Sequence, residues 1–523
     1  MSLQYSSLIN CSKKTIHYYF QKSVIFWIYS IFLTFIYNTY FFEGQPHEVF
    51  FASLIIVFLN LGIFTLLTLF SCFSYLVFPL VNICCAVAQY FYVIFNVPLR
   101  YKSISWALEA NKFEITSYLS PTLFIVIVGG ALLGFFQAYL SRHLRQLPFF
   151  TRLFVVLLTA LLSIGCYEVS TRVLKSTGQS DTARLASLSK VTPISIVKAL
   201  QLYYKEEKKA EKLLALPTAQ TIQSTLQFDE KPILVFVIGE SARAGNFSLN
   251  GYSRRTNPLL EKEGNLINLG VAESFDTSTR RSLIGMLTNA TRENRKPSLG
   301  SFVTFFNKHN YNTYFFSLQN RLGRSGHLTD ALISSAKTVK YMKGQDPVLL
   351  PVLQQVVRQD ESMNGSLILL HTKGSHFSYR SNYTNEFRVF LPDQYTNEEY
   401  KENITPFVNA YDNTIVKTDW MLSQAIEILR NKNAVLVYTS DHGESLGENG
   451  QMFHGGTDAI QKKVPFMIWL SGEYRANHPD ITKALLSVSK NTISHDNLYH
   501  TILGLGGIDS PAFNSSLDLT RIN

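Results

Sequence analysis

Cysteine is missing from most of the chain. The five cysteines, Cys11, Cys72, Cys84, Cys85 and Cys166, all lie in the first third of the 523 residues. The remaining two thirds therefore contain neither disulfides nor thiolate metal ligands. A metal bound in that part would need histidine, aspartate, glutamate or hydroxyl ligands.

A second region contains no charge. Residues 49–99 have no Asp, Glu, Lys, Arg or His, and about fifty such residues are too many for one membrane helix but suit two. In a later apolar stretch, Gly129, Gly130 and Gly134 offer close contacts to a neighbouring helix. Together the apolar stretches predict a transmembrane domain of five helices, at about 24–42, 49–70, 72–97, 118–140 and 152–170.

Basic residues around these spans predict their orientation. Lys13, Lys14 and Lys22 precede the first span, and the segment Arg142–Arg152 carries three arginines between the fourth and the fifth. Basic flanks stay in the cytoplasm, so five spans place the large C-terminal part outside, in the periplasm of a bacterium. No small-residue cleavage site follows the first apolar stretch, and we expect no cleaved signal peptide. The alternative is a soluble protein with very hydrophobic core helices.

Other signals are also missing. The net charge is +10, yet no basic stripe with interleaved aromatics indicates nucleic-acid binding. The spread of Lys and Arg suits an anionic membrane surface or phosphate-bearing substrates instead. We find no internal repeat and no low-complexity tract.

The chain divides into three parts. We expect a transmembrane domain at 1–171, a connector at 172–231 and a periplasmic domain at 232–523. In the connector, Pro193 opens a helical stretch, 194–216, that Pro217 would end. Its charge run indicates either a helix on the membrane surface or an ordinary solvated helix face.

The C-terminal part alternates between apolar runs and helical patterns. Continuous apolar runs are typical of strands buried on both faces of a parallel sheet. Helical stretches such as Ala410–Leu429 lie between them, which predicts an α/β domain with a mainly parallel sheet. The candidate strands are 233–238, 311–316, 367–370, 434–438 and 465–470.

Polar residues follow three of these strands directly. Glu240 follows the first, His371 and His376 follow 367–370, and Asp441 with His442 follows 434–438. Because the carboxyl ends of parallel strands share one edge of the sheet, we expect these side chains to meet there. Carboxylate and neutral imidazole both suit zinc. The alternative for Asp441 and His442 is a surface loop with a capping aspartate.

These motifs resemble those of bacterial phosphoethanolamine transferases, members of the alkaline phosphatase and sulfatase superfamily. The segments 239–243 (GESAR) and 247–252 (FSLNGY) are similar to the opening motif of that family. The segment 440–450 (SDHGESLGENG), with His454 and Gly455, is similar to its second metal motif. Asp276–Thr279 resembles the segment of the nucleophile, and 411–413 and 494–497 also match. The resemblance covers the membrane domain, the connector and the soluble domain.

The resemblance implies roles for individual residues. Thr279 would be the nucleophile, with Ser241 as a rival, and one zinc would be bound by Glu240, Thr279, Asp441 and His442. His376 and His454 would bind a second zinc or the phosphoryl group. Three further residues match substrate contacts, and three in the loop 100–117 match positions that bind the ammonium head of the lipid donor. These are Asn320, Arg324 and His371, and Glu109, Asn111 and Glu114.

The resemblance also implies an activity. The enzyme would move phosphoethanolamine from phosphatidylethanolamine to lipid A, a core sugar or a periplasmic glucan through a phospho-threonine intermediate, releasing diacylglycerol. It would be a monomer among the lipids of the bacterial inner membrane. The alternatives are a phosphoglycerol transferase, a phosphatase or sulfatase, and a non-catalytic receptor with the same fold. A sulfatase would need a C/S-x-P-x-R motif, which Thr277–Arg281 does not contain.

The chain departs from the family pattern around the predicted nucleophile. Many relatives bracket the threonine with cysteines, whereas Phe275 and Gly285 stand at those positions here. Arg280 and Arg281 follow the threonine directly. We therefore expect the segment to be held without a cross-link, and the arginine pair to bear on which acceptor is used.

Overall fold

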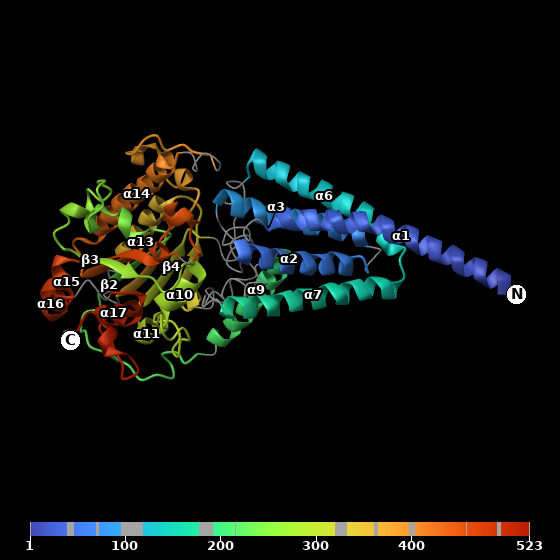
Figure 1. Cartoon of the computed structure of the whole chain (residues 1–523). Helices are drawn as coiled ribbons and strands as arrows, with labels where there is room; N and C mark the ends of the chain where they lie inside the picture. Colours follow the sequence, from blue (N-terminus) through green and yellow to red (C-terminus); the bar gives the residue numbers. More distant parts are fainter. Residues whose placement is uncertain are drawn as a thin grey trace. The chain divides into compact units, whose positions relative to one another are not determined.

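The computed structural model shows two compact units, one with the N-terminal helices up to Tyr203 and one with the chain from Tyr204 onward (Figure 1). Helix α9 (Ile194–Leu214), in the predicted connector, runs from one into the other. The structure describes residues 2–38, 46–69, 73–95, 119–176, 192–214, 216–319, 332–359, 365–396, 403–456, 458–488 and 493–521.

The first unit is built from long apolar helices. They are α1 (Ser2–Tyr37), α2 (Pro46–Leu67), α3 (Ser74–Phe95), α6 (Pro121–Arg145) and α7 (Phe149–Ser176). Outward-facing side chains such as Ile125, Phe150 and Leu161 are more than 65% exposed, which suits a lipid environment rather than water. Within the described residues, four stretches are long and apolar enough to cross a membrane: His17–Tyr37, Ser74–Phe95, Pro121–Arg145 and Phe149–Val169.

The prediction of an apolar helical N-terminal domain is thus confirmed, while the count of five spans is not. Within the described residues, α2 contributes a shorter apolar helical stretch, Ser53–Leu67. The fourth span begins at Pro121 because Ser120 Oγ accepts a hydrogen bond from Leu123 N at 3.1 Å, which caps the helix there. The predicted spans at 24–42, 72–97, 118–140 and 152–170 each correspond to one of the four candidates, whereas the predicted span at 49–70 stays a prediction.

Small residues bring α3 and α6 close together. A Cβ atom on Gly134 would lie 2.4 Å from Pro79 Cα, and one on Gly130 would lie 3.1 Å from the Asn82 carbonyl oxygen. The close contact predicted for these two glycines is therefore present. A Cβ on Gly129 would meet nothing within 4 Å, so the contact predicted for that glycine is wrong: on the helix it faces away from α3.

Replacing Gly134 with alanine is expected to lower the stability of the first unit by about 1–3 kcal/mol, because the methyl group would overlap the α3 backbone. Gly129→Ala is the matched control, and its better helix propensity makes it neutral or stabilising by up to about 1 kcal/mol. A thiol-reactive fluorophore can follow heat unfolding in detergent, since every cysteine of the chain lies at or before Cys166. Equal unfolding midpoints for the two variants would contradict the packing described.

The second unit contains a seven-stranded sheet with the order β3-β10-β7-β2-β6-β4-β5. Five neighbouring strands, from β7 to β5, are parallel, and β10 runs antiparallel to both β7 and β3. The mainly parallel sheet is therefore confirmed. The strands are β2 (Ile233–Gly239), β3 (Leu266–Glu273), β4 (Asn312–Ser317), β5 (Thr338–Tyr341), β6 (Ser366–His371), β7 (Ala434–Ser440) and β10 (Lys463–Leu470).

Helices cover both faces of this sheet (Figure 1). On one face, alternate residues of β2, such as Leu234 and Phe236, pack in a core with α10 (Thr279–Leu287), α11 (Val303–Lys308) and α17 (Leu498–Leu505). On the other face lie α13 (Leu349–Gln359) and α14 (Thr405–Leu429). Burial on both faces explains why the central strands are continuously apolar. Two further helices in the described part of this unit are α15 (Gly472–Asn477) and α16 (Pro479–Ser487).

Candidate active site

The central strands bring three groups of polar residues to one edge of the sheet. β2 lies between β6 and β7, and Gly239 pairs with Ser440 while Ile238 pairs with His371. The residues that follow these pairs therefore leave the sheet side by side. Side-chain atoms of Glu240, Asp441 and His442 lie within 4.8 Å of one another, and all three residues are buried.

Thr279 lies next to this group because it is the first residue of α10. Its Oγ1 donates a hydrogen bond to Glu240 Oε2 at 3.1 Å and lies 3.3 Å from His442 Nε2. Unpaired backbone N–H groups and the helix dipole make a helix N-terminus favourable for phosphoryl oxygens. The hydroxyl thus lies beside a carboxylate and an imidazole, at the N-terminus of a helix.

The charges of this group call for a cation. Burial, together with the charge of Asp441, raises the pKa of the Glu240 carboxyl well above its usual range. Burial lowers the pKa of His442 to about 4, so its imidazole is neutral and cannot balance the carboxylates. Its Nδ1 donates to the Gly443 carbonyl at 2.9 Å, which leaves the Nε2 lone pair to a metal. Among the described residues, buried Asp441 Oδ2 has no hydrogen-bond donor. The donor set therefore fits zinc.

A second buried group shares His442 and adds Glu444 and His454. The hairpin of β8 (Ser445–Leu446) and β9 (Met452–Phe453) pairs Ser445 with Phe453, and so brings residues 444 and 454 together. His454 Nδ1 donates to Glu444 Oε2 at 2.9 Å, and the Tyr379 hydroxyl donates to Glu444 Oε1 at 3.0 Å. Burial raises the pKa of Glu444 to about 7. The sequence analysis missed Glu444. Its position two residues after His442 could have indicated it, because side chains two residues apart in an extended chain point to the same side.

The two other predicted histidines lie outside both groups. The ring centroid of His376 is 5.7 Å from that of His454, and its Nδ1 donates to the Phe377 carbonyl at 2.6 Å. His371 is buried at the end of β6, with its Nδ1 3.4 Å from Ser317 Oγ. Burial lowers its pKa to about 4. A role for either residue in binding substrate or metal stays a prediction.

Ser241, the rival nucleophile, is completely buried. Its hydroxyl donates to Glu240 Oε1 at 2.8 Å, and its backbone N–H donates to Asp441 Oδ1 at 3.0 Å. Its φ of 57° is unusual for a residue with a side chain. These contacts indicate a residue that holds the two carboxylates in place, whereas Thr279 is partly exposed and can be reached by a substrate.

The segment before Thr279 is anchored without a cross-link, as the sequence predicted. The ring of Phe275 lies 2.3 Å from where a Cβ of Gly285 would be, so only glycine fits beneath it. The Arg295 guanidinium covers the ring with 4.2 Å between its carbon and the ring centroid. Arg295 also donates to the Phe275 carbonyl at 3.0 Å and to Asp276 Oδ2 at 2.5 Å. Arg281 lies 3.7 Å from the same carboxylate oxygen.

One residue at the site was not predicted, and several predicted residues lie outside the described part of the chain. Gln319 Nε2 donates to Glu240 Oε2 at 3.2 Å and to the Thr372 carbonyl at 2.9 Å, and no motif indicated it. The predicted substrate contacts Asn320, Arg324, Glu109, Asn111 and Glu114 lie outside the described residues.

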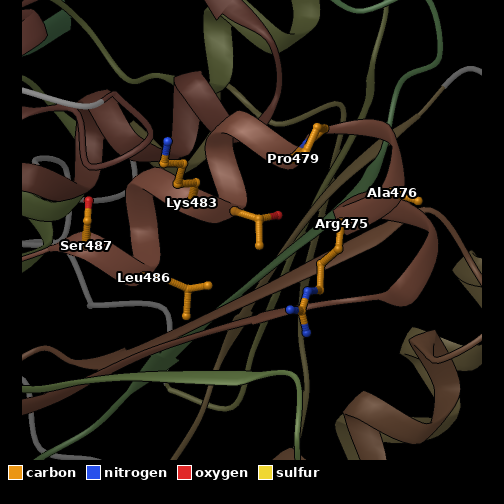
Figure 2. A pocket seen from close by; sticks show the side chains of 7 residues that line it. Arg475, Ala476, Pro479, Lys483, Leu486 and Ser487 are labelled. Carbon is orange, nitrogen blue, oxygen red and sulfur yellow. The ribbon is translucent and has the colours of Figure 1, made fainter.

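A surface hollow of about 550 Å³ lies elsewhere on the second unit (Figure 2). It is formed by α15 and α16, which follow Leu470 at the end of β10. Leu470 pairs with Val435 near the amino end of β7, whereas Asp441 follows the carboxyl end of that strand. The hollow and Asp441 therefore lie at opposite ends of the strands. It is therefore not part of the candidate active site. Its lining residues are Arg475, Ala476, Pro479, Thr482, Lys483, Leu486 and Ser487.

Known proteins are similar to this chain in sequence and in fold. Residues 232–508 match the sulfatase family. Phosphoethanolamine transferase EptA of Escherichia coli K12 is 28% identical over an alignment of 462 positions, and the match covers 83% of each chain. The integral membrane protein lipooligosaccharide phosphoethanolamine transferase A of Neisseria meningitidis has a TM-score of 0.77 at 23% identity and covers 95% of this chain and 98% of its own.

One solved structure of another protein, similar in fold to part of this chain, is a zinc complex. The zinc complex of the C-terminal periplasmic domain of EcEptC from Escherichia coli has a TM-score of 0.50 at 24% identity, covering 58% of this chain and 90% of its own. Together with the sulfatase match over more than half of the residues and the matching motifs at the site, the relatives lead to one assignment. The chain is a transferase that belongs to the phosphoethanolamine transferase family of the alkaline phosphatase and sulfatase superfamily.

Proposed function

We propose that the protein transfers phosphoethanolamine from phosphatidylethanolamine to lipopolysaccharide or a periplasmic glucan through a covalent intermediate on Thr279. The observation that carries this proposal is the place of Thr279 Oγ1. It lies 3.1 Å from Glu240 Oε2 and 3.3 Å from His442 Nε2, at the first residue of α10. A hydroxyl becomes a useful nucleophile only when a neighbouring base or metal activates it, and here a carboxylate and an imidazole lie within reach of the hydroxyl.

Zinc is the proposed cofactor. Glu240, Asp441 and His442, together with Thr279, would hold one ion, and the second buried group of His442, Glu444 and His454 offers ligands for another. When bound, zinc acts as a Lewis acid that lowers the pKa of a hydroxyl and offsets charge on phosphoryl oxygens. Glu444 would join His454 in the proposed second site, and a role for His376 there stays a prediction.

The first step forms the covalent intermediate. The Thr279 hydroxyl gives up its proton in the direction of its hydrogen bond to Glu240 Oε2. Its oxygen attacks the phosphorus of the lipid, the bond from phosphorus to the glycerol oxygen breaks, and that oxygen takes a proton as diacylglycerol leaves. The N-terminus of α10 faces the phosphoryl oxygens, where partial positive charge is favourable.

The second step releases the threonine. An oxygen of the acceptor attacks the same phosphorus, the bond to Thr279 Oγ1 breaks, and the threonine regains its proton. Dividing the transfer into two steps allows one site to serve two bulky substrates in turn. The apolar N-terminal helices suit an enzyme of the inner membrane, where the lipid donor resides. We propose that the second unit lies in the periplasm and that the enzyme acts as a monomer.

The covalent intermediate is directly testable by intact mass measurement. The full-length protein in detergent, given phosphatidylethanolamine and no acceptor, is expected to gain the mass of one phosphoethanolamine group. Peptide mapping should locate the added group on Thr279. Release of diacylglycerol without any adduct, or an adduct on Ser241, would contradict the proposal.

A further inference from the structure

His495 belongs to neither metal-binding group, yet both nitrogens of its ring contact segments that lead to the reacting residues. Nδ1 accepts a hydrogen bond from the backbone N–H of Phe275 at 3.1 Å. Nε2 donates to the carbonyl oxygen of Ser440 at 3.0 Å. A backbone N–H can only donate and a carbonyl can only accept, so these partners require the neutral ring with its proton on Nε2. Burial lowers the pKa of His495 to about 4, which agrees with a neutral ring.

The two partners lie just before the residues of the proposed chemistry. Phe275 is four residues before Thr279 and begins the segment that Arg295 also holds. Ser440 is the last residue of β7, directly before Asp441 and His442. The imidazole is therefore a rigid spacer between the segment of the nucleophile and the strand of the metal ligands.

His495 is itself held firmly. Ser494 and Asn497 form a capping box around it, in which the Ser494 N–H donates to Asn497 Oδ1 at 3.0 Å. Ser494 also pairs with Glu273, the last residue of β3. The Arg292 guanidinium forms ion pairs with Glu273 and with Asp496, the residue after His495. Because the residues on both sides of His495 are fixed in this way, its ring can hold both of its partners at a set distance.

We propose that His495 is a positioning residue that sets the separation between the Thr279 hydroxyl and the metal ligands Asp441 and His442. This inference rests on the proposed function, because it concerns how that nucleophile is aligned. A shift of the reacting atoms by about 1 Å can cost about 100-fold in rate. Loss of either hydrogen bond would free one side of the spacer while leaving every proposed ligand and the nucleophile in the chain.

Two conservative replacements remove the hydrogen bonds one at a time. In His495→Asn, the amide oxygen reaches the place of Nδ1 and keeps the bond from Phe275, but nothing reaches Ser440. In His495→Gln, the amide nitrogen reaches the place of Nε2 and keeps the bond to Ser440, but the Phe275 N–H loses its partner. Each variant is expected to lower kcat about 10-fold or more by misalignment, with KM within about twofold of the parent value.

The assay uses the full-length protein in detergent and a phosphatidylethanolamine with a fluorescent acyl chain, whose diacylglycerol product is separated and counted. Zinc content and the heat-unfolding midpoint are measured on the same samples. The expected result is reduced kcat at unchanged zinc content. His500→Gln is the matched control, because His500 is also buried and bonds to the Asn514 N–H at 3.3 Å. That variant is expected to keep the parent kcat.

Three outcomes would overturn the inference. The first is the parent kcat in both His495 variants, and the second is a loss of zinc in proportion to the loss of rate. The third is failure of both conservative variants to fold, which would make His495 a structural residue only. The proposed function fails separately, since it would be lost if Thr279→Ala kept its activity, whatever the His495 variants do.

Discussion

Thr279→Ala is expected to reduce release of diacylglycerol from phosphatidylethanolamine by about 10,000-fold or more, the scale of loss when a covalent nucleophile is removed. Alanine has no oxygen to attack phosphorus, so the two-step route is closed. The partners Glu240 and His442 stay in place, because their own contacts to Ser241 and Gly443 do not involve Thr279. The measurement is the initial rate with the fluorescent lipid in detergent.

Two further variants separate this effect from indirect ones. Thr279→Ser keeps the hydroxyl and is expected to keep most of the rate. Ser278→Ala removes the neighbouring hydroxyl, which donates to Asp276 Oδ1 at 3.3 Å, and is expected to change the rate little. Zinc content should be retained in Thr279→Ala, since Glu240, Asp441 and His442 remain as ligands. A Thr279→Ala protein that releases diacylglycerol at more than about one hundredth of the parent rate would exclude Thr279 as the nucleophile.

The end of the sheet that carries the proposed metal ligands could be predicted because the signal is local. β2 and β7 are continuous apolar runs that end at Glu240 and at Asp441, and a parallel sheet brings such ends together. Two strands gave no such signal. β3 lies at one edge of the sheet and is only partly buried, and β5 has four largely exposed residues at the other edge. Neither therefore needs a continuous apolar sequence.

Features that depend on pairing between distant segments were not predictable from local patterns. The antiparallel direction of β10 depends on its partners, since a continuous apolar run does not indicate whether a strand is parallel or antiparallel to its neighbours. Thr279 has no local mark of a nucleophile and was found only through the resemblance. Glu444 and His495 become visible as part of the site when the β8–β9 hairpin and the contact of residue 495 with β7 are seen.

A buried ion pair beneath the site gives the second large prediction. Lys417 Nζ on α14 lies 2.5 Å from Asp346 Oδ2, and both side chains are completely buried. Asp346 Oδ1 also accepts from the backbone N–H of Lys373 at 2.7 Å, and Lys417 donates to the Gly374 carbonyl at 3.1 Å. Gly374 has a φ of 52° and lies so close to Glu240 that a Cβ would be 2.5 Å from its carbonyl oxygen. The pair therefore fixes the turn that supports Glu240.

Lys417→Met is expected to lower the free energy of unfolding of the second unit by about 3–5 kcal/mol, because it leaves the Asp346 carboxylate buried without a counter-charge. The loss can be measured by hydrogen exchange in peptides of α14 and β6 in the full-length protein. Lys340→Met, at an exposed position of β5, is the control and is expected to change stability by no more than about 0.5 kcal/mol.

The double variant Asp346→Asn with Lys417→Met tests the cause of that loss. It removes both charges, while the asparagine oxygen can still accept from Lys373, so it is expected to be more stable than Lys417→Met alone. A lost packing contact of the lysine stem would instead persist in the double variant, because methionine is present in both proteins. A double variant no more stable than the single one would therefore show that charge is not the reason. Since the same pair holds the turn against Glu240, recovered stability should be accompanied by recovered diacylglycerol release.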